Sequence, residues 1–127
     1  MHAVAAIPQP LRRAAFAVLA AALLGAAIAA ALAVGGWWQI PVFWAAPDLA
    51  LLAGMGRGVE RGQLHPRAVR AYNLLHRVWG PLVLGALVAL GTLPATLIVG
   101  ALAWGFHIAL DRAAGYGLRG RDGFQRG

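Results

Sequence analysis

The sequence predicts an all-α protein, a four-helix transmembrane bundle with both termini in the cytoplasm. Hydrophobic residues make up 61% of the 127 residues, against roughly 45–50% in an ordinary soluble domain. Charged residues make up only 12%, about half the usual share. A soluble domain of this size needs more polar cover, whereas the chain contains apolar runs long enough to cross a bilayer. We therefore expect a single membrane domain over residues 1–127.

The first predicted span covers residues 14–34, a run without any charged residue. At 1.5 Å per residue it reaches across a hydrocarbon core of about 30 Å. The preceding Arg12 and Arg13 resemble the start of a signal peptide, but the run exceeds the apolar length of such a signal, so we expect a retained helix. Small residues at four-residue spacing predict a face that lets a neighbouring helix approach closely. They are Ala17, Ala21, Gly25 and Ala29.

The second predicted span covers residues 40–55 and follows a break at Gly35-Gly36. Pro47 lies inside it and should kink the helix, because proline removes a backbone hydrogen bond. Tryptophans around the break suit the interface between lipid and water. These predicted interfacial anchors are Trp37, Trp38 and Trp44.

The remaining spans are predicted over residues 68–90 and 95–113. Pro66 fits the first turn of the third helix, and Gly80-Pro81 should bend it. The Gly- and Arg-rich tail over residues 114–127 is too polar to enter lipid. With four spans, all eleven arginines fall on one side and none on the other, which places both termini in the cytoplasm by the positive-inside rule. Arginines at the ends of apolar runs argue against a nucleic-acid partner.

Polar side chains inside the spans need a separate explanation. A charged group in hydrocarbon costs about 2.5–3.5 kcal/mol, so such groups normally face the bundle interior and pair. By helix rise, Asp48, His76 and His107 each lie roughly 8–9 Å from the cytoplasmic edge, which puts three helices' polar groups in one layer. Asp111 shares a helix face with His107, and Asn73 shares one with His76. The predicted polar cluster is Asp48, Asn73, His76, His107 and Asp111.

This cluster admits several interpretations. Histidine and aspartate at four-residue spacing can bind a metal, relay protons, or form a polar clasp that fixes helix register. Ala103, four residues before His107, also matches the Ala-x-x-x-His arrangement with which light-harvesting helices hold a pigment. Two other kinds of site are excluded. The chain has no cysteine and no serine, and therefore no thiolate site and no Ser-His-Asp triad.

Three motifs resemble a family of small bacterial membrane proteins, domain of unknown function 4260. They are His107-Ile-Ala-Leu-Asp111-Arg112, continued to Gly123-Phe124, then Pro47-Asp48-Leu49, and Tyr72-Asn73-Leu74-Leu75-His76. The resemblance implies about four helices, a multi-pass position in a bacterial inner membrane and no assigned activity. A more distant likeness, to inner-membrane metal-dependent hydrolases, rests on Pro47-Asp48 and His76. Ala50 and Leu51 stand where those hydrolases carry a second acid and a histidine.

Two functions remain open at this point. The first is a non-catalytic accessory or scaffolding subunit that packs in the bilayer against other membrane proteins, with the polar cluster fixing helix packing. The second is a membrane-embedded metal-binding protein or metal-dependent hydrolase that uses the same cluster. A pigment-contacting subunit of a photosynthetic complex is a lesser alternative. No residue is assigned a catalytic role, and the sequence names no metal or cofactor.

Overall fold

The computed structural model describes residues 5–56 and 58–126. Its helices, in chain order, are α1 (Gln9–Val34), α2 (Gln39–Ala45), the 3-10 turn η1 (Ala46–Asp48), α3 (Leu49–Gly54), α4 (Pro66–Leu75), α5 (Trp79–Ala89) and α6 (Leu97–Ala114). Within these residues the only β pairing is an isolated bridge between Arg119 and Gln125. The predicted all-α class is confirmed.

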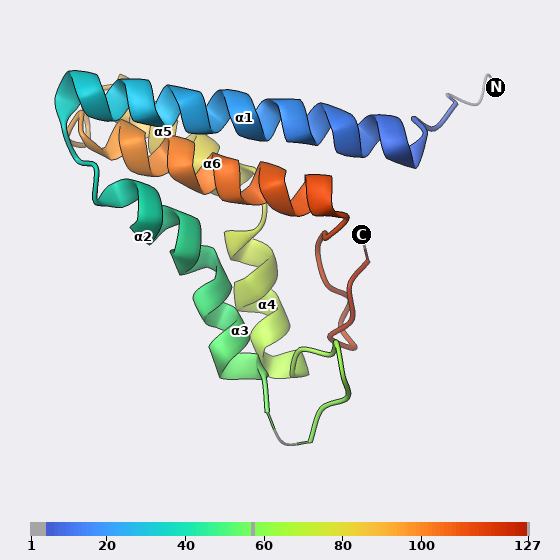
Figure 1. The fold of residues 1–127 in the computed structure, drawn as a ribbon. Helices are drawn as coiled ribbons and strands as arrows, with labels where there is room; N and C mark the ends of the chain where they lie inside the picture. The colour runs from blue at the N-terminus through green and yellow to red at the C-terminus, as the bar shows by residue number, and fades with distance from the viewer. Residues whose placement is uncertain (1–4, 57, 127) are drawn as a thin grey trace.

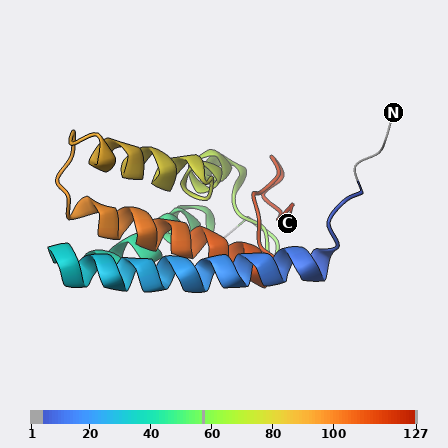
Figure 2. The same cartoon turned by 90° about the horizontal axis from the view of Figure 1, so that it is seen from above.

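Helix α6 forms the centre of a three-helix layer, with α1 on one side and α5 on the other (Figure 2). Hydrogen bonds tie α6 to its neighbours at both ends. Arg13 Nε donates to the Ala113 carbonyl at 2.8 Å, and Gln39 Nε2 donates to the Thr96 carbonyl at 2.8 Å. Because α1 begins where α6 ends, these two helices run antiparallel (Figure 1).

Two helices of the layer are long and apolar enough to cross a membrane. They are α1, with 26 residues, and α6, with 18. They correspond to the predicted spans over residues 14–34 and 95–113. The exposed surface of the layer is apolar, since Val18, Leu32, Leu82 and Leu90 are each more than half exposed. Such a surface suits a lipid environment.

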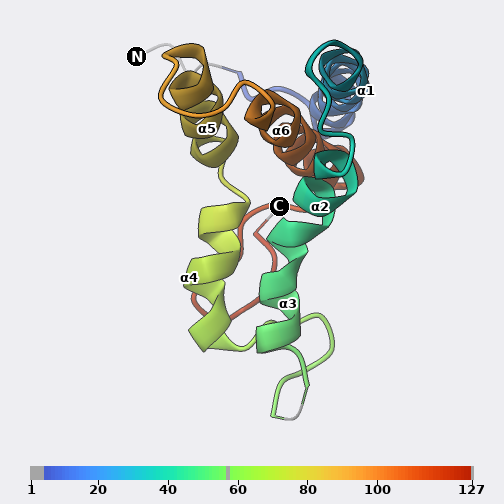
Figure 3. The ribbon, with the colours of Figure 1, turned by 90° about the vertical axis from the view of Figure 1, so that its left-hand side faces the viewer.

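The second predicted span is not one helix. Residues 40–55 divide into α2, η1 and α3, and the break contains Pro47, where the kink was predicted. Helix α2 packs on α6, while α3 leaves the layer and packs beside α4 (Figure 3). The three predicted interfacial anchors are exposed, at 49% for Trp37, 62% for Trp38 and 45% for Trp44.

The prediction of one helix over residues 68–90 is wrong. The chain breaks at residues 76–78, between α4 and α5, about one turn before the bend expected at Gly80-Pro81. Pro81 lies in the first turn of α5, where a missing N–H costs nothing. Gly80-Pro81 therefore begins a helix, and the break itself lies at His76.

The predicted small-residue stripe on α1 does not face α6. All four of its residues are exposed, and a Cβ added at Gly25 would meet no atom within 4 Å. The buried face of α1 consists of Ala20, Ala27 and Ala31. In a helix this rich in alanine, four-residue spacing occurs on more than one face, so spacing alone did not identify the packed one.

The C-terminal tail folds back onto the loop before α4. Leu64 N–H donates to the Gly123 carbonyl at 2.9 Å, and Leu64 is 1% exposed. Gly123 has φ +90°, and a Cβ there would overlap the Leu64 carbonyl oxygen. The tail is therefore an ordered part of the fold, and only glycine fits at this contact.

Candidate metal centre

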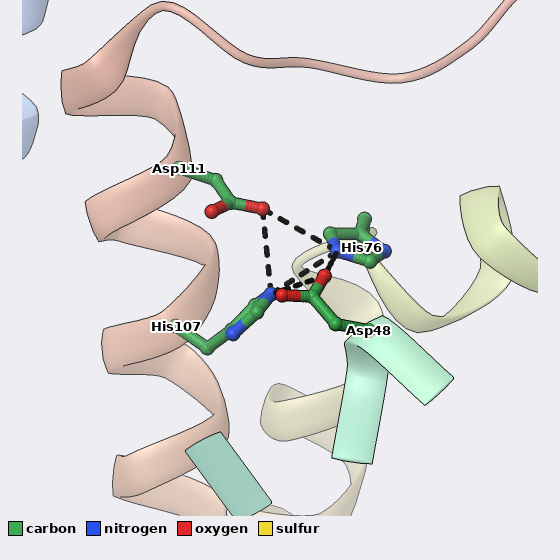
Figure 4. Close-up of side chains that lie close together, drawn as sticks. All are labelled: Asp48, His76, His107 and Asp111. Atoms are coloured by element: carbon green, nitrogen blue, oxygen red, sulfur yellow. Dashed lines mark hydrogen bonds and ion pairs between the residues drawn. The ribbon is translucent and has the colours of Figure 1, made fainter. Parts of the chain in front are cut away.

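Helix α6 supplies two of the four side chains at the site. His107 and Asp111 lie one turn apart on the same face, and Figure 4 shows both pointing away from the helix toward the same point. The His107 side chain is 4% exposed and that of Asp111 is 23% exposed. The i, i+4 spacing therefore gives the contact predicted from the sequence.

The breaks in the other two segments supply the remaining side chains. Asp48 is the last residue of η1, directly after the buried Pro47. His76 follows the last residue of α4 and is 1% exposed. Both interruptions thus occur where a polar side chain enters the cluster.

Side chains of α6 hold the end of α4 in place. The last carbonyls of a helix have no partner within it, and here Trp104 Nε1 donates to the Leu75 carbonyl at 2.8 Å. Arg112 donates from one guanidinium nitrogen to the His76 carbonyl at 3.0 Å. Trp104, His107 and Asp111 recur at spacings of three and four residues, which places them along one face, and Arg112 directly follows Asp111. That face therefore fixes both the helix end and the position of His76.

The four donor atoms form a compact group. His76 Nε2 lies 3.1 Å from Asp48 Oδ1 and 3.3 Å from Asp111 Oδ2. His107 Nε2 lies 3.4 Å from Asp48 Oδ1, 3.3 Å from Asp111 Oδ2 and 3.1 Å from His76 Nε2. A tetrahedral ion with bonds of about 2.0–2.1 Å separates its ligand atoms by about 3.3–3.4 Å. The five distances are close to that value, whereas the bound for the whole group, which includes the pair of carboxylate oxygens, is 4.8 Å.

The orientation of His76 suits a metal ligand. Its Nδ1 lies 2.8 Å from the Tyr72 carbonyl, which only accepts hydrogen bonds, so Nδ1 carries the proton and donates. When Nε2 carries no proton, its lone pair points at the cluster. Histidines that bind metals usually donate their other ring N–H in this way. The Tyr72 ring stacks on His76 with centroids 3.9 Å apart, and the Arg119 guanidinium lies over Tyr72 at 4.9 Å.

The charge of the cluster calls for a cation or for added protons. Two aspartates and two neutral imidazoles carry a charge of −2, and a partly buried charge of that size is costly without compensation. One divalent ion gives a neutral assembly. Protons on both imidazoles give the same balance, which is the polar-clasp interpretation. The N₂O₂ donor set suits Zn²⁺ and similar transition metals better than Ca²⁺ or Mg²⁺, which prefer oxygen ligands.

One predicted member lies outside the cluster. Asn73 Nδ2 donates to the Arg119 carbonyl at 2.9 Å, and its Oδ1 accepts from Arg119 N–H at 2.7 Å. Asn73 therefore fastens the tail to α4. His107 directs Nε2 into the cluster, so that atom is not free for a pigment beside Ala103.

Four supporting residues were not assigned these roles from the sequence. They are Tyr72, Trp104, Arg112 and Arg119. Trp104 precedes His107 by three residues, and this spacing was a usable signal for a shared face. Nothing in the spacing of Arg119 indicated its position, because it reaches Tyr72 only through the fold of the tail.

Comparison with known proteins identifies one matching family model. The family model described as domain of unknown function (DUF4260) matches residues 11–127. This confirms the resemblance seen in the three sequence motifs. No curated protein and no solved structure matches the chain.

Proposed function

The chain belongs to the DUF4260 family, and we propose that it is an integral membrane protein that binds one divalent transition-metal ion, of the Zn²⁺ type. The proposed ligands are Asp48, His76, His107 and Asp111. The observation that carries this proposal is that one donor atom from each of the four residues lies within 4.8 Å of the other three. Three separate elements contribute these atoms, so local sequence alone does not account for their meeting.

Asp48 gives the proposed site its access to solvent. Its side chain is 46% exposed, whereas those of the two histidines are 1% and 4% exposed. A bound ion would therefore have three well-covered ligands and one ligand on the open side. An ion held by all four side chains would have no open position for water, as in structural zinc sites. Metal-assisted hydrolysis would require water to replace the exposed Asp48, which would leave three protein ligands and an activated water.

The proposed position in the membrane has four passes, of which the second and third are broken helices, and both termini lie on the cytoplasmic side of a bacterial inner membrane. The distribution of arginine supports this orientation. The end of the layer where Arg13 meets Ala113 continues into the Arg-rich loop and tail. The opposite end, where Gln39 meets Thr96, has turns without any arginine.

Metal analysis of the purified chain tests the proposed site. We expect the detergent-purified protein, loaded with Zn²⁺ and desalted, to retain about one ion per chain by elemental mass spectrometry. His107→Ala should lose that ion, because it removes a ligand from the closed side of the site. His65→Asn is the matched control, since His65 lies outside the cluster and accepts a hydrogen bond from Arg67 N–H at the start of α4, a role that asparagine also fills. Equal metal content in both variants would refute the proposal.

The outward-facing stripe on α1 favours a second candidate function, an accessory subunit that packs against another membrane protein. Small side chains at four-residue spacing allow helices to approach closely, and all four are exposed within the part of the chain that the structure describes. We expect gentle extraction to retain a stoichiometric partner that Ala21→Leu displaces, while Ala26→Leu, the same change at an exposed position farther around α1, leaves it bound. Absence of any stoichiometric partner at native expression would contradict this function.

A further inference from the structure

A second polar site lies between α4 and the C-terminal tail, on a different side of α4 from the metal centre. It is a pocket of about 440 Å³ whose lining includes Arg70, Arg77 and Arg121, together with Asn73 and Leu74. The arginines come from α4, from the residue directly after His76, and from the tail. The proposed metal site does not use any of them.

The charge of this pocket is not balanced by the described protein. Among residues 5–56 and 58–126, no aspartate or glutamate forms an ion pair with the three arginines. The nearest acid in sequence, Asp122, pairs with Arg126 at 2.9 Å and accepts from Phe124 N–H at 3.2 Å. The pocket is therefore lined by three arginines without an acidic partner among these residues, and their positive charge favours binding of an anion.

The tail is held against α4 rather than lying loose beside it. The two hydrogen bonds between Asn73 and the backbone of Arg119 fasten the tail two residues before Arg121. Leu64 and Gly123 form a second attachment two residues after it. Arg121 is thus kept beside the arginines of α4.

The surroundings of the pocket identify the anion's source. An exposed apolar surface begins at Leu74, which is 68% exposed, and continues through Val78 at 50% and Trp79 at 69% onto α5. On α5 it includes Leu82 and Val83, at 58% and 54%, and α5 follows directly above α4 in Figure 3. A tryptophan at the border between an apolar surface and a basic segment is typical of the level of lipid headgroups.

We infer that this pocket binds the phosphate-bearing headgroup of an anionic phospholipid. Arginine is well suited to phosphate because its planar fork donates two parallel hydrogen bonds. The acyl chains would lie along the exposed surface of α5 while the headgroup occupies the arginine pocket. The inference is independent of the metal site and goes beyond it, because neither the ligand nor the residues are shared.

Native mass spectrometry of the full chain in mixed micelles tests this inference. The probes are phosphatidylglycerol and phosphatidylcholine, and inorganic phosphate serves as the competing free anion. We expect wild-type protein to retain phosphatidylglycerol in preference to phosphatidylcholine, and phosphate at millimolar concentration not to displace it. The double variant Arg70→Gln, Arg121→Gln should lower phosphatidylglycerol affinity by about 30-fold.

The control variant carries the same loss of charge outside the pocket. Arg61→Gln, Arg67→Gln removes two exposed arginines of the same polar region that do not line it, and its affinity should stay within about twofold of wild type. An equal loss in both double variants, no preference for the anionic lipid, or full displacement by phosphate would each overturn the inference. If the pocket double variant loses its helical circular dichroism signal, two single variants replace the double ones. Arg121→Gln, on the tail, should then lower phosphatidylglycerol affinity, and Arg61→Gln, on the loop, should not; an equal effect of the two would overturn the inference.

Discussion

His76 combines three contacts that follow from its place at the end of α4. Its N–H bonds back to Tyr72 and Asn73, its Nδ1 donates to the Tyr72 carbonyl, and its own carbonyl accepts from Arg112. These contacts leave Nε2 as the atom that reaches the cluster. A single residue thereby ends a helix, anchors it to α6 and places Nε2 in the four-residue cluster.

Zn²⁺ binding should weaken on acidification. Metal ligands must be deprotonated, so protons compete with the ion for Nε2 of His76 and His107. We expect affinity to fall at least about tenfold between pH 8 and pH 5.5, with proton release on binding, measured by titration calorimetry in two buffers of different ionisation enthalpy. His65→Asn should show the same pH dependence as wild type. A pH-independent affinity would mean that these imidazoles do not bind the ion.

The sequence predicted most of the residues that form the cluster. Helix rise put Asp48, His76 and His107 at one depth, and the structure brings them together with Asp111. Asn73 was expected in the same group because it shares a face with His76, but it bonds the tail. Spacing identifies which residues share a helix face, whereas the partner of that face depends on how distant segments fold.

At the scale of elements, hydropathy alone did not locate the helix breaks. Residues 68–90 contain a nearly continuous apolar run from Leu74 onward, so the sequence resembles one span. The break is stabilised because Trp104 and Arg112 of α6 donate hydrogen bonds to the carbonyls that the break leaves without a partner in the helix. This cause lies on another helix and leaves no local signal at residues 76–78.

Gln39 joins the start of α2 to the first turn of α6, and its loss should destabilise the layer. It is 1% exposed, donates to the Thr96 carbonyl and accepts from Gly100 N–H at 3.1 Å. Gln39→Leu removes both hydrogen bonds and takes the side-chain acceptor from the buried Gly100 N–H, while the Thr96 carbonyl keeps its bond from Val99 N–H at 3.2 Å. We therefore expect a loss of about 1–3 kcal/mol in the free energy of unfolding, measured by denaturant titration in detergent.

The exposed Gln9 at the start of α1 provides the control for that measurement. Gln9→Leu makes the same chemical change at an exposed position outside the Gln39 contacts, and it should stay within about 0.5 kcal/mol of wild type. Equal stability of the two variants would show that the Gln39 bonds contribute nothing to the layer.

For the whole molecule, the proposed orientation predicts which side of the membrane each turn occupies. The chain has no cysteine, so single introduced cysteines report accessibility without background. Thr92→Cys, in the exposed turn between α5 and α6, should react with a membrane-impermeant maleimide in intact spheroplasts. Glu60→Cys, in the exposed loop before α4, should react only after lysis. Labelling of both from the same side would contradict the orientation.

Composition indicated the class of the molecule but not its shape. The apolar share and the two long runs correctly indicated α1 and α6. The division into a three-helix layer and the pair α3 and α4, which leaves it, depends on the breaks at Pro47 and His76. The outward direction of the stripe on α1 was likewise invisible, because alanine occurs on every face of that helix.

X-ray absorption spectroscopy of the Zn²⁺-loaded full chain in detergent tests the proposed metal site most directly. We predict one shell of about four nitrogen and oxygen ligands at about 2.0–2.1 Å, with the outer-shell scattering of two imidazole rings from His76 and His107. A shell of oxygen ligands alone without imidazole scattering, or a chain that retains no zinc, would contradict the site and leave the cluster as a polar clasp between helices.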